Sequence, residues 1–102
     1  MIVVSRFRAV EDLAGPLQVM RSALAAMPGY VSGSLGRNLD DPDLWLLETT
    51  WADVGSYRRA LSAYDVKVAV APVMVPALDE PSAYEPVGAG RETNEQRPRT
   101  LD

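Results

Sequence analysis

The chain of 102 residues contains neither cysteine nor histidine. Without cysteine no disulfide framework can form, and without either residue the usual zinc sites are excluded. The same absences exclude Ser-His-Asp and Cys-His nucleophile systems, histidine-ligated haem, and the iron site of two histidines and a carboxylate. Any catalysis must therefore use Asp, Glu, Tyr, Lys, Arg, Ser or Thr side chains, or draw its reactivity from the substrate.

The sequence also lacks a long apolar run, a basic surplus and a signal-peptide pattern. No apolar run approaches the roughly 18 residues of a membrane span. The net charge is −4, from 10 basic and 14 acidic residues, and phosphate binding needs a cationic surface. The first charge comes at Arg6, too early for the apolar stretch of a signal peptide. We expect a cytoplasmic protein that binds neither nucleic acid nor membranes.

The composition changes at Gly88. Residues 88–102 contain no aromatic residue, and their only apolar residues are Ala89 and Leu101. Such a segment cannot bury enough apolar surface to offset its ordering entropy, so we predict a disordered tail after a single domain at residues 1–87. A core of this size gives only a few kcal/mol of stability, and oligomerisation is a common remedy.

Before this tail, the residue pattern predicts the order β-α-β-β-α-β, with strands at residues 2–8, 30–39, 44–51 and 82–87. The first helix shows apolar residues at helical spacing, begins with an Asp12 cap or with Pro16 in its first turn, and stops at Pro28-Gly29. Asp53 is placed to cap the second helix, three residues before Ser56. This order is typical of a ferredoxin-like α+β fold, with four antiparallel strands and helices on one face.

The second helical stretch is ambiguous at its end. Tyr57, Leu61, Tyr64 and Val68 fall on one face of a continuous helix. Residues 65–71, however, alternate and are β-branched, so propensity alone favours a strand there.

Three pieces of the sequence resemble the antibiotic biosynthesis monooxygenase domain family. They are the opening strand at residues 2–7, the run Met27-Pro28-Gly29-Tyr30 at the first helix–strand junction, and Trp51-Ala52-Asp53 followed by an aromatic at Tyr57. The run from Tyr57 to Lys67 is also similar to actinobacterial members. Together the resemblance covers residues 2–87.

This resemblance implies a ferredoxin-like subunit that forms a homodimer, sheet to sheet, in a dimeric α+β barrel, with a pocket between the sheet and the helices of each subunit. In such proteins the second helical stretch is broken into two segments, so we predict a helix rather than a strand at Val66 to Ala71. Some members are cofactor-independent oxygenases of aromatic polyketides, which implies a small aromatic substrate and no cofactor.

The oxygenase members have an Asn four residues before the strand-end Trp, a Tyr six residues after it, and a later Arg. Trp51 and Tyr57 match two of these positions and are the catalytic candidates. The Asn position holds Leu47, and the late basic position is at best Lys67. These two are substrate-binding candidates at which the chain departs from the family pattern.

Arg6 is a further substrate-binding candidate. Haem-degrading members have an Asn, a Trp and a His where this chain has approximately Arg6, Ala60 and no histidine, which excludes that activity. By strand alternation, Arg6 and Arg8 share a sheet face with Val4. Arg6 could bind an anionic substrate oxygen there, although an ion pair with Glu48 on a neighbouring strand is favoured.

The other candidates also have structural explanations. Trp51 and Tyr57 form either a pocket pair or a core pair that joins strand to helix, and the core pair is the more common arrangement. Tyr64 could lie over a pocket mouth as a substrate-binding residue, together with Asp65. Asp65 is more simply the cap of the next helical segment.

The run Asp40-Asp41-Pro42-Asp43 is typical of a turn. Its three carboxylates could bind calcium, but the twelve-residue loop with its Gly and final Glu is missing, so we expect no metal.

Two functional hypotheses remain. The first is a cofactor-independent monooxygenase that oxidises an electron-rich phenol or hydroquinone to a quinone, with Tyr57 as the proton relay. The second is a non-catalytic dimeric module, which either binds a small ligand or is purely structural. A cavity of about 300 Å³ or more between the sheet and the helices would favour ligand chemistry, and a filled space there would favour a structural role.

Overall fold

The computed structural model describes residues 1–88, so the predicted tail, apart from Gly88, lies outside the described residues. Four strands form one sheet in the order β2-β3-β1-β4, and every neighbouring pair is antiparallel. The elements are β1 (Ile2–Arg8), α1 (Ala14–Ala25), β2 (Tyr30–Arg37), β3 (Leu44–Trp51), α2 (Val54–Leu61), α3 (Tyr64–Val70), a 3-10 turn (Ala71–Val73) and β4 (Ala83–Tyr84). This architecture confirms the ferredoxin-like α+β prediction.

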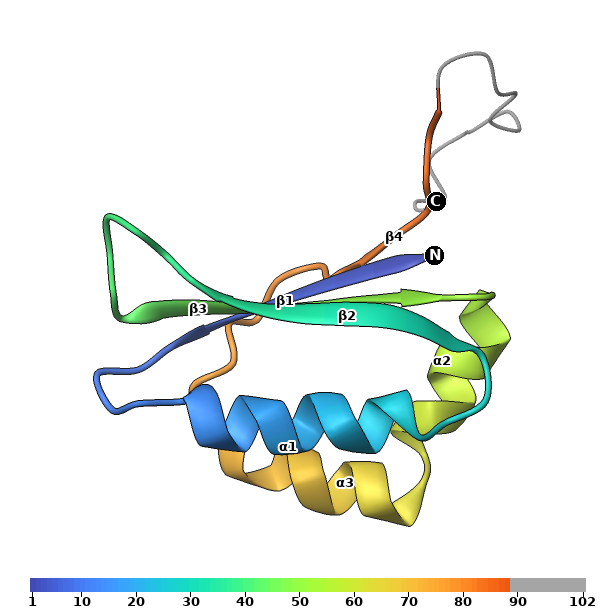
Figure 1. Cartoon of the computed structure of the whole chain (residues 1–102), viewed down its shortest axis with the longest axis horizontal. Coiled ribbons are helices and arrows are strands. Elements are labelled where there is room, and N and C mark those ends of the chain that lie inside the picture. The colour runs from blue at the N-terminus through green and yellow to red at the C-terminus, as the bar shows by residue number, and fades with distance from the viewer. Residues whose placement is uncertain (89–102) are drawn as a thin grey trace.

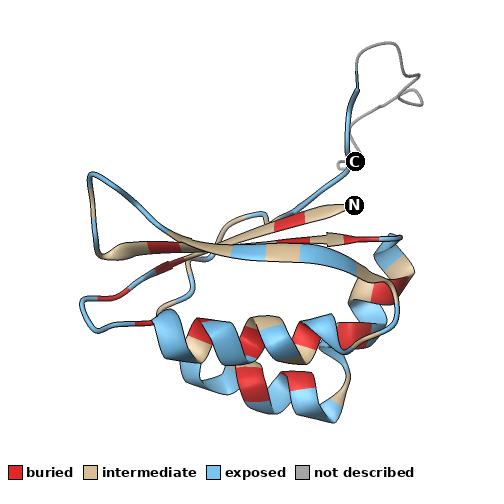
Figure 2. Ribbon diagram, viewed as in Figure 1, coloured by how far each residue is buried: buried red, intermediate tan, exposed pale blue. Residues whose placement is uncertain are grey.

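The helices all lie on one face of the sheet (Figure 1). The alternation of residues along β3 explains why, because the odd-numbered side chains are apolar or buried and the even-numbered ones are more exposed. Trp45, Leu47, Thr49 and Trp51 are buried toward the helices, whereas the residues between them are only partly buried. No helix of the described residues covers the opposite face, and Figure 2 shows the buried positions concentrated between the two layers.

Among the three helices, α1 contributes the most buried residues to the core. Leu17, Met20 and Leu24 recur at spacings of three and four residues, and all three are buried in the same cluster as Phe7. The predicted apolar face of this helix is therefore confirmed. At its start, the N-cap is Leu13 without a side-chain cap, so the predicted Asp12 cap is wrong, although the Asp12 carboxylate accepts a hydrogen bond from the Ala14 N–H at 2.9 Å. The alternative prediction, Pro16 in the first turn, is confirmed.

The second helical stretch breaks between α2 and α3, at Ser62 and Ala63. The predicted helix after Val66 is confirmed, because Val66 and Ala69, three residues apart, are both buried. Packing against the rest of the core thus outweighs the strand propensity of this segment.

The break also makes two predictions about this region wrong. Tyr64 is 78% exposed and Val68 is 53% exposed, because a continuous helical face cannot pass through the turn between the helices. Asp65 is not the cap of α3, because Ala63 occupies that position. Asp65 lies in the first turn, where its negative charge interacts favourably with the positive end of the helix dipole.

The predicted strand ends were too long. β2 ends at Arg37 rather than at residue 39, and β4 contains only Ala83 and Tyr84 rather than residues 82–87. On one side the pairing ends at Tyr84, because Tyr84 lies opposite Ile2, the first residue of β1. On the other side, the chain continues along β1 with single hydrogen bonds, such as Val4 N–H to the Ser82 carbonyl at 2.7 Å and Leu78 N–H to the Arg6 carbonyl at 2.9 Å.

The described residues contain no helix with the length and apolar character that crossing a membrane requires.

Gly29 joins the two halves of the fold. Its φ is +92°, and a Cβ built there would collide with the side chain of Ser56 on α2. Its carbonyl also accepts a hydrogen bond from the Ala52 N–H at 2.7 Å. Only glycine therefore satisfies both the backbone conformation and the close approach.

We predict that Gly29→Ala lowers the free energy of unfolding by about 3 kcal/mol, from the strained φ and the overpacking together. The control is Gly15→Ala in α1, where a Cβ has open space and no positive φ. That change should raise stability by up to about 1 kcal/mol. Urea unfolding of both variants tests this, and equal effects would contradict the close-approach argument.

Candidate active site at the end of strand β3

Trp51 is the anchor of the candidate site. It ends β3 and is only 1% exposed. Its indole Nε1 donates a hydrogen bond to Thr49 Oγ1 at 2.9 Å, and its backbone N–H donates to the Met1 carbonyl at 2.8 Å. Because Thr49 lies two residues earlier on the same strand face, the buried indole has its acceptor within β3 itself.

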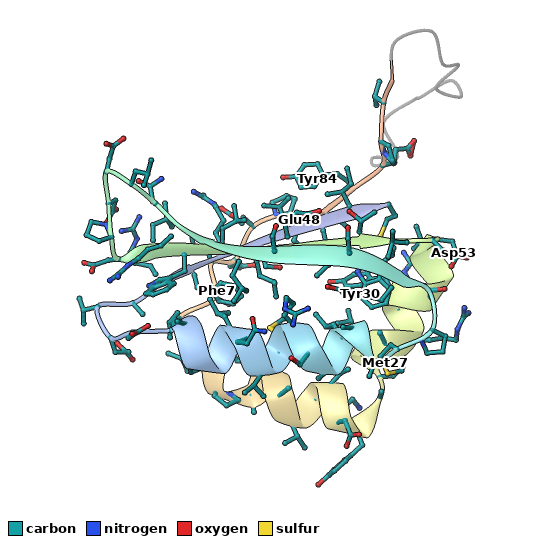
Figure 3. The ribbon with its side chains drawn as sticks, viewed as in Figure 1. Phe7, Met27, Tyr30, Glu48, Asp53 and Tyr84 are labelled. Atoms are coloured by element: carbon teal, nitrogen blue, oxygen red, sulfur yellow. The ribbon has the colours of Figure 1, made fainter. Side chains whose placement is uncertain are left out.

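Two tyrosine rings pack on the indole. Tyr30, its partner across the β2–β3 pairing, meets it edge-on with the ring centroids 5.4 Å apart. Tyr57 on α2 lies 5.6 Å from the Trp51 ring, with the planes inclined at 55°. The rings of Trp51 and Tyr57 are therefore in contact, as both the pocket pair and the core pair require. Figure 3 shows Tyr30 between the sheet and the helix layer.

Asp53 orients the helix that carries Tyr57. Its carboxylate accepts a hydrogen bond from the Ser56 N–H at 2.7 Å, as the capping pattern predicts. This bond is the main reason why the pKa of Asp53 lies below its ordinary value. The cap fixes the first turn of α2, and Tyr57 follows directly after it.

Tyr57 lines a groove of about 410 Å³ between α2 and β4. The groove exceeds the volume that we set for ligand chemistry. Trp51 is not one of the residues that line it, but its ring packs on that of Tyr57. The lining residues are Met1, Val54, Tyr57, Arg58, Ala83, Tyr84 and Glu85.

The Tyr57 hydroxyl is available to a ligand. No residue among 1–88 forms a hydrogen bond with this hydroxyl. Burial raises the pKa of Tyr57 above its ordinary value, because the phenolate loses solvation there. At neutral pH this side chain is therefore a hydrogen-bond donor and a poor base.

Arg58 is a groove residue that the sequence analysis missed. Its only sequence signal is its position beside Tyr57 on α2. No side chain within residues 1–88 forms an ion pair or a hydrogen bond with its guanidinium. The next residue, Arg59, differs because its guanidinium donates to Ser56 Oγ at 3.3 Å.

The structure places Arg6 on the open sheet face, away from this groove. Its guanidinium donates to both carboxylate oxygens of Glu80 at 2.7 Å. The expected pair with Glu48 is wrong, because the strand register sets Glu48 opposite Val4 and not opposite Arg6. Glu48 instead accepts hydrogen bonds from Ser34 and Thr50 on its own sheet face.

The other substrate-binding candidates also lie outside the groove. Leu47 is 2% exposed and belongs to the core. Tyr64 and Lys67 lie on α3 and are exposed. The structure therefore brings Trp51 and Tyr57 together and leaves Arg6, Leu47, Tyr64 and Lys67 elsewhere.

The aspartate turn between β2 and β3 has structural partners. Asn38 Oδ1 accepts hydrogen bonds from the N–H groups of Asp40 and Asp41, and the Asp41 carboxylate pairs with Arg8 at 2.7 Å. Within residues 1–88, no group of three acidic side chains is close enough to hold a metal ion.

A family model described as antibiotic biosynthesis monooxygenase matches residues 6–72. The chain belongs to this family. The match begins within β1 and ends within the 3-10 turn, and so includes the Gly29 junction, Trp51 and Tyr57. It agrees with the family resemblance seen in the sequence.

Solved structures of family members have the same fold. SnoaB, a cofactor-independent oxygenase from Streptomyces nogalater, superposes with a TM-score of 0.74 at 21% identity, over 89% of this chain and 96% of that one. A candidate antibiotic biosynthesis monooxygenase from Chloroflexus aurantiacus J-10-fl gives 0.67 at 20% identity, over 87% and 95%. One from Deinococcus radiodurans gives 0.66 at 18%, over 90% and 98%. No curated protein matches the chain.

Trp51 and Tyr57 should differ in what their replacement does to stability. Trp51→Phe removes a buried hydrogen bond and leaves a small cavity, so we expect a loss of about 3 kcal/mol in the free energy of unfolding. Tyr57→Phe removes a hydroxyl that has no partner within residues 1–88, and should change the free energy of unfolding by less than about 0.5 kcal/mol. Urea unfolding measures both, and a large loss in Tyr57→Phe would assign that hydroxyl a structural role.

Proposed function

We propose that the chain is a cofactor-independent monooxygenase that oxidises an electron-rich phenol or hydroquinone to a quinone. The observation that carries this proposal is Tyr57, which lines the groove and packs on the buried Trp51 ring, and whose hydroxyl has no hydrogen-bond partner within residues 1–88. Family membership supports it, as does the shared fold of an oxygenase that needs no cofactor.

The substrate can supply all the electrons of such a reaction. An ionised phenol with hydrogen on its para carbon transfers electrons from its ring to O₂, and a C–O bond forms at that carbon. One oxygen atom becomes the second quinone carbonyl, and the other leaves as water with two hydrogens from the substrate. A phenol C₆H₆O and one O₂ thus give C₆H₄O₂ and H₂O. A hydroquinone C₆H₆O₂ that is oxygenated at a ring carbon bearing hydrogen likewise gives the hydroxyquinone C₆H₄O₃ and H₂O.

The protein then has three tasks: to exclude water, orient the ring and stabilise negative charge. Tyr57 would donate a hydrogen bond to the oxyanion, and protonate the peroxide oxygen as its O–O bond breaks. Trp51 would hold the Tyr57 ring in place. Because its pKa is raised, Tyr57 acts in this scheme as a donor, with its proton restored from solvent.

A second candidate function is a non-catalytic module that binds a small aromatic ligand in the same groove. The observation that favours it is Leu47, a buried core residue at the position where the oxygenase members carry an Asn.

We also propose that the protein is a homodimer whose open sheet faces pack together. The open face carries apolar side chains that are only partly buried in one subunit, among them Val4, Leu44 and Leu46. Ser34 and Gly36 on β2 are small enough for a partner to approach closely.

Light scattering at micromolar concentration should give twice the mass of one chain, because a stable interface of this kind buries well above roughly 1,000 Å². Leu46→Glu on the open face should shift the protein toward monomer. The matched control is Leu61→Glu on α2, which is outside that face. A wild-type monomer would contradict the proposed dimer.

Oxygen uptake tests the proposed activity, using hydroxylated anthrones and naphthols with metal ions chelated. Tyr57→Phe should lower turnover by about 10²-fold, the low end for loss of a positioned acid. Tyr64→Phe is the matched control, since this ring is exposed on α3 and should not affect turnover. Unchanged turnover in Tyr57→Phe would remove this residue from the mechanism, and binding without turnover would favour the ligand-binding module.

A further inference from the structure

Arg58 stands apart from the other arginines of the described chain. Within residues 1–88 every other arginine side chain has a partner: Arg6 with Glu80, Arg8 with Asp41, Arg21 with Gln18 and Tyr30, Arg37 with the Pro42 carbonyl, and Arg59 with Ser56. The Arg58 guanidinium has none of these contacts, and it lines the groove. An unpaired guanidinium in a ligand-sized groove is a ready partner for an anion.

The groove is asymmetric in charge. On its α2 wall, Arg58 supplies a positive charge, Tyr57 a neutral phenol and Val54 apolar surface. On its β4 wall lies the acidic residue Glu85. The Met1 ammonium, which is also part of the groove, already donates to the Trp51 carbonyl at 3.1 Å. Among the groove side chains, Arg58 is therefore the cationic group that can donate hydrogen bonds to an anionic ligand oxygen.

We propose that Arg58 makes this groove selective for aromatic molecules in their anionic form. This inference rests on the proposed function and adds the charge state of its substrate. Tyr57 is a poor base, so in this scheme the phenol is ionised by solvent and the protein binds the anion. If the anion binds tenfold more tightly than the neutral molecule, the pKa of the bound phenol falls by one unit. The bound form is then the electron-rich form that reacts with O₂.

Two probes of nearly equal shape measure this preference in the full chain. Naphthalene-1-sulfonate is anionic at pH 7, and naphthalene-1-sulfonamide is neutral. Both are titrated and followed by protein NMR, with shifts expected at α2 and β4. We expect the wild-type chain to bind the sulfonate about tenfold more tightly, as a charge-assisted hydrogen bond implies.

Variants assign the preference to Arg58. Arg58→Gln should reduce the difference between the probes to about twofold or less, whereas Arg58→Lys, which keeps the charge, should retain most of it. The matched control is Arg59→Gln, which removes the same charge one residue further along α2 and should keep the preference. Thermal unfolding checks that each variant is folded.

Three results would overturn the proposal: equal affinity of the two probes for the wild-type chain, an unchanged preference in Arg58→Gln, or no binding of either probe. The measurement involves no oxygen chemistry. An absence of oxygen uptake together with an Arg58-dependent preference would therefore count against the proposed activity alone. Normal Tyr57-dependent oxygen uptake in Arg58→Gln would count against the role of Arg58 alone.

Discussion

The burial of Trp51 at the end of β3 is the constraint on which the rest of the site depends. A nearly inaccessible indole needs an acceptor for its N–H, and Thr49 supplies one from the same face of the same strand. Trp51 therefore packs into the core between the end of β3 and the helix layer. This fixes the path of the chain into α2, where Asp53 begins the helix and Tyr57 packs on the indole. Gly29 permits this arrangement, because any side chain there would meet Ser56.

The groove is suited to chemistry that needs hydrogen-bond donors rather than a strong base or nucleophile. A chain without histidine or cysteine has few strong bases or nucleophiles, and the groove offers a neutral phenol and a guanidinium in their place. Both are hydrogen-bond donors, and both suit the stabilisation of negative charge that is already present on a ligand. A substrate that carries its own electrons and ionises in water is the kind of molecule for which such a groove is sufficient.

The groove and the open sheet face meet at β4. This strand contributes Ala83 and Tyr84 to the groove, and Tyr84 projects to the same side of the sheet as Glu48, away from the helices (Figure 3). β4 is short and pairs with β1 through only two residues. In the proposed dimer, a partner packed on the open face would contact the strand that forms one wall of the groove. Assembly and ligand binding would then be physically linked through β4.

The sequence by itself determined the element order, the one-sided sheet, the core face of α1, the Asp53 cap and the meeting of Trp51 with Tyr57. These features depend on local periodicity, capping and short chain separations, which are visible in residue order. Tertiary structure decided the rest. The strand-like segment after Val66 became a helix because its side chains pack into the core. Arg6 found Glu80, 74 positions away, because the chain returns along β1. Arg58 became a groove residue because β4 closes the opposite wall, and no local pattern encodes a contact between segments so far apart.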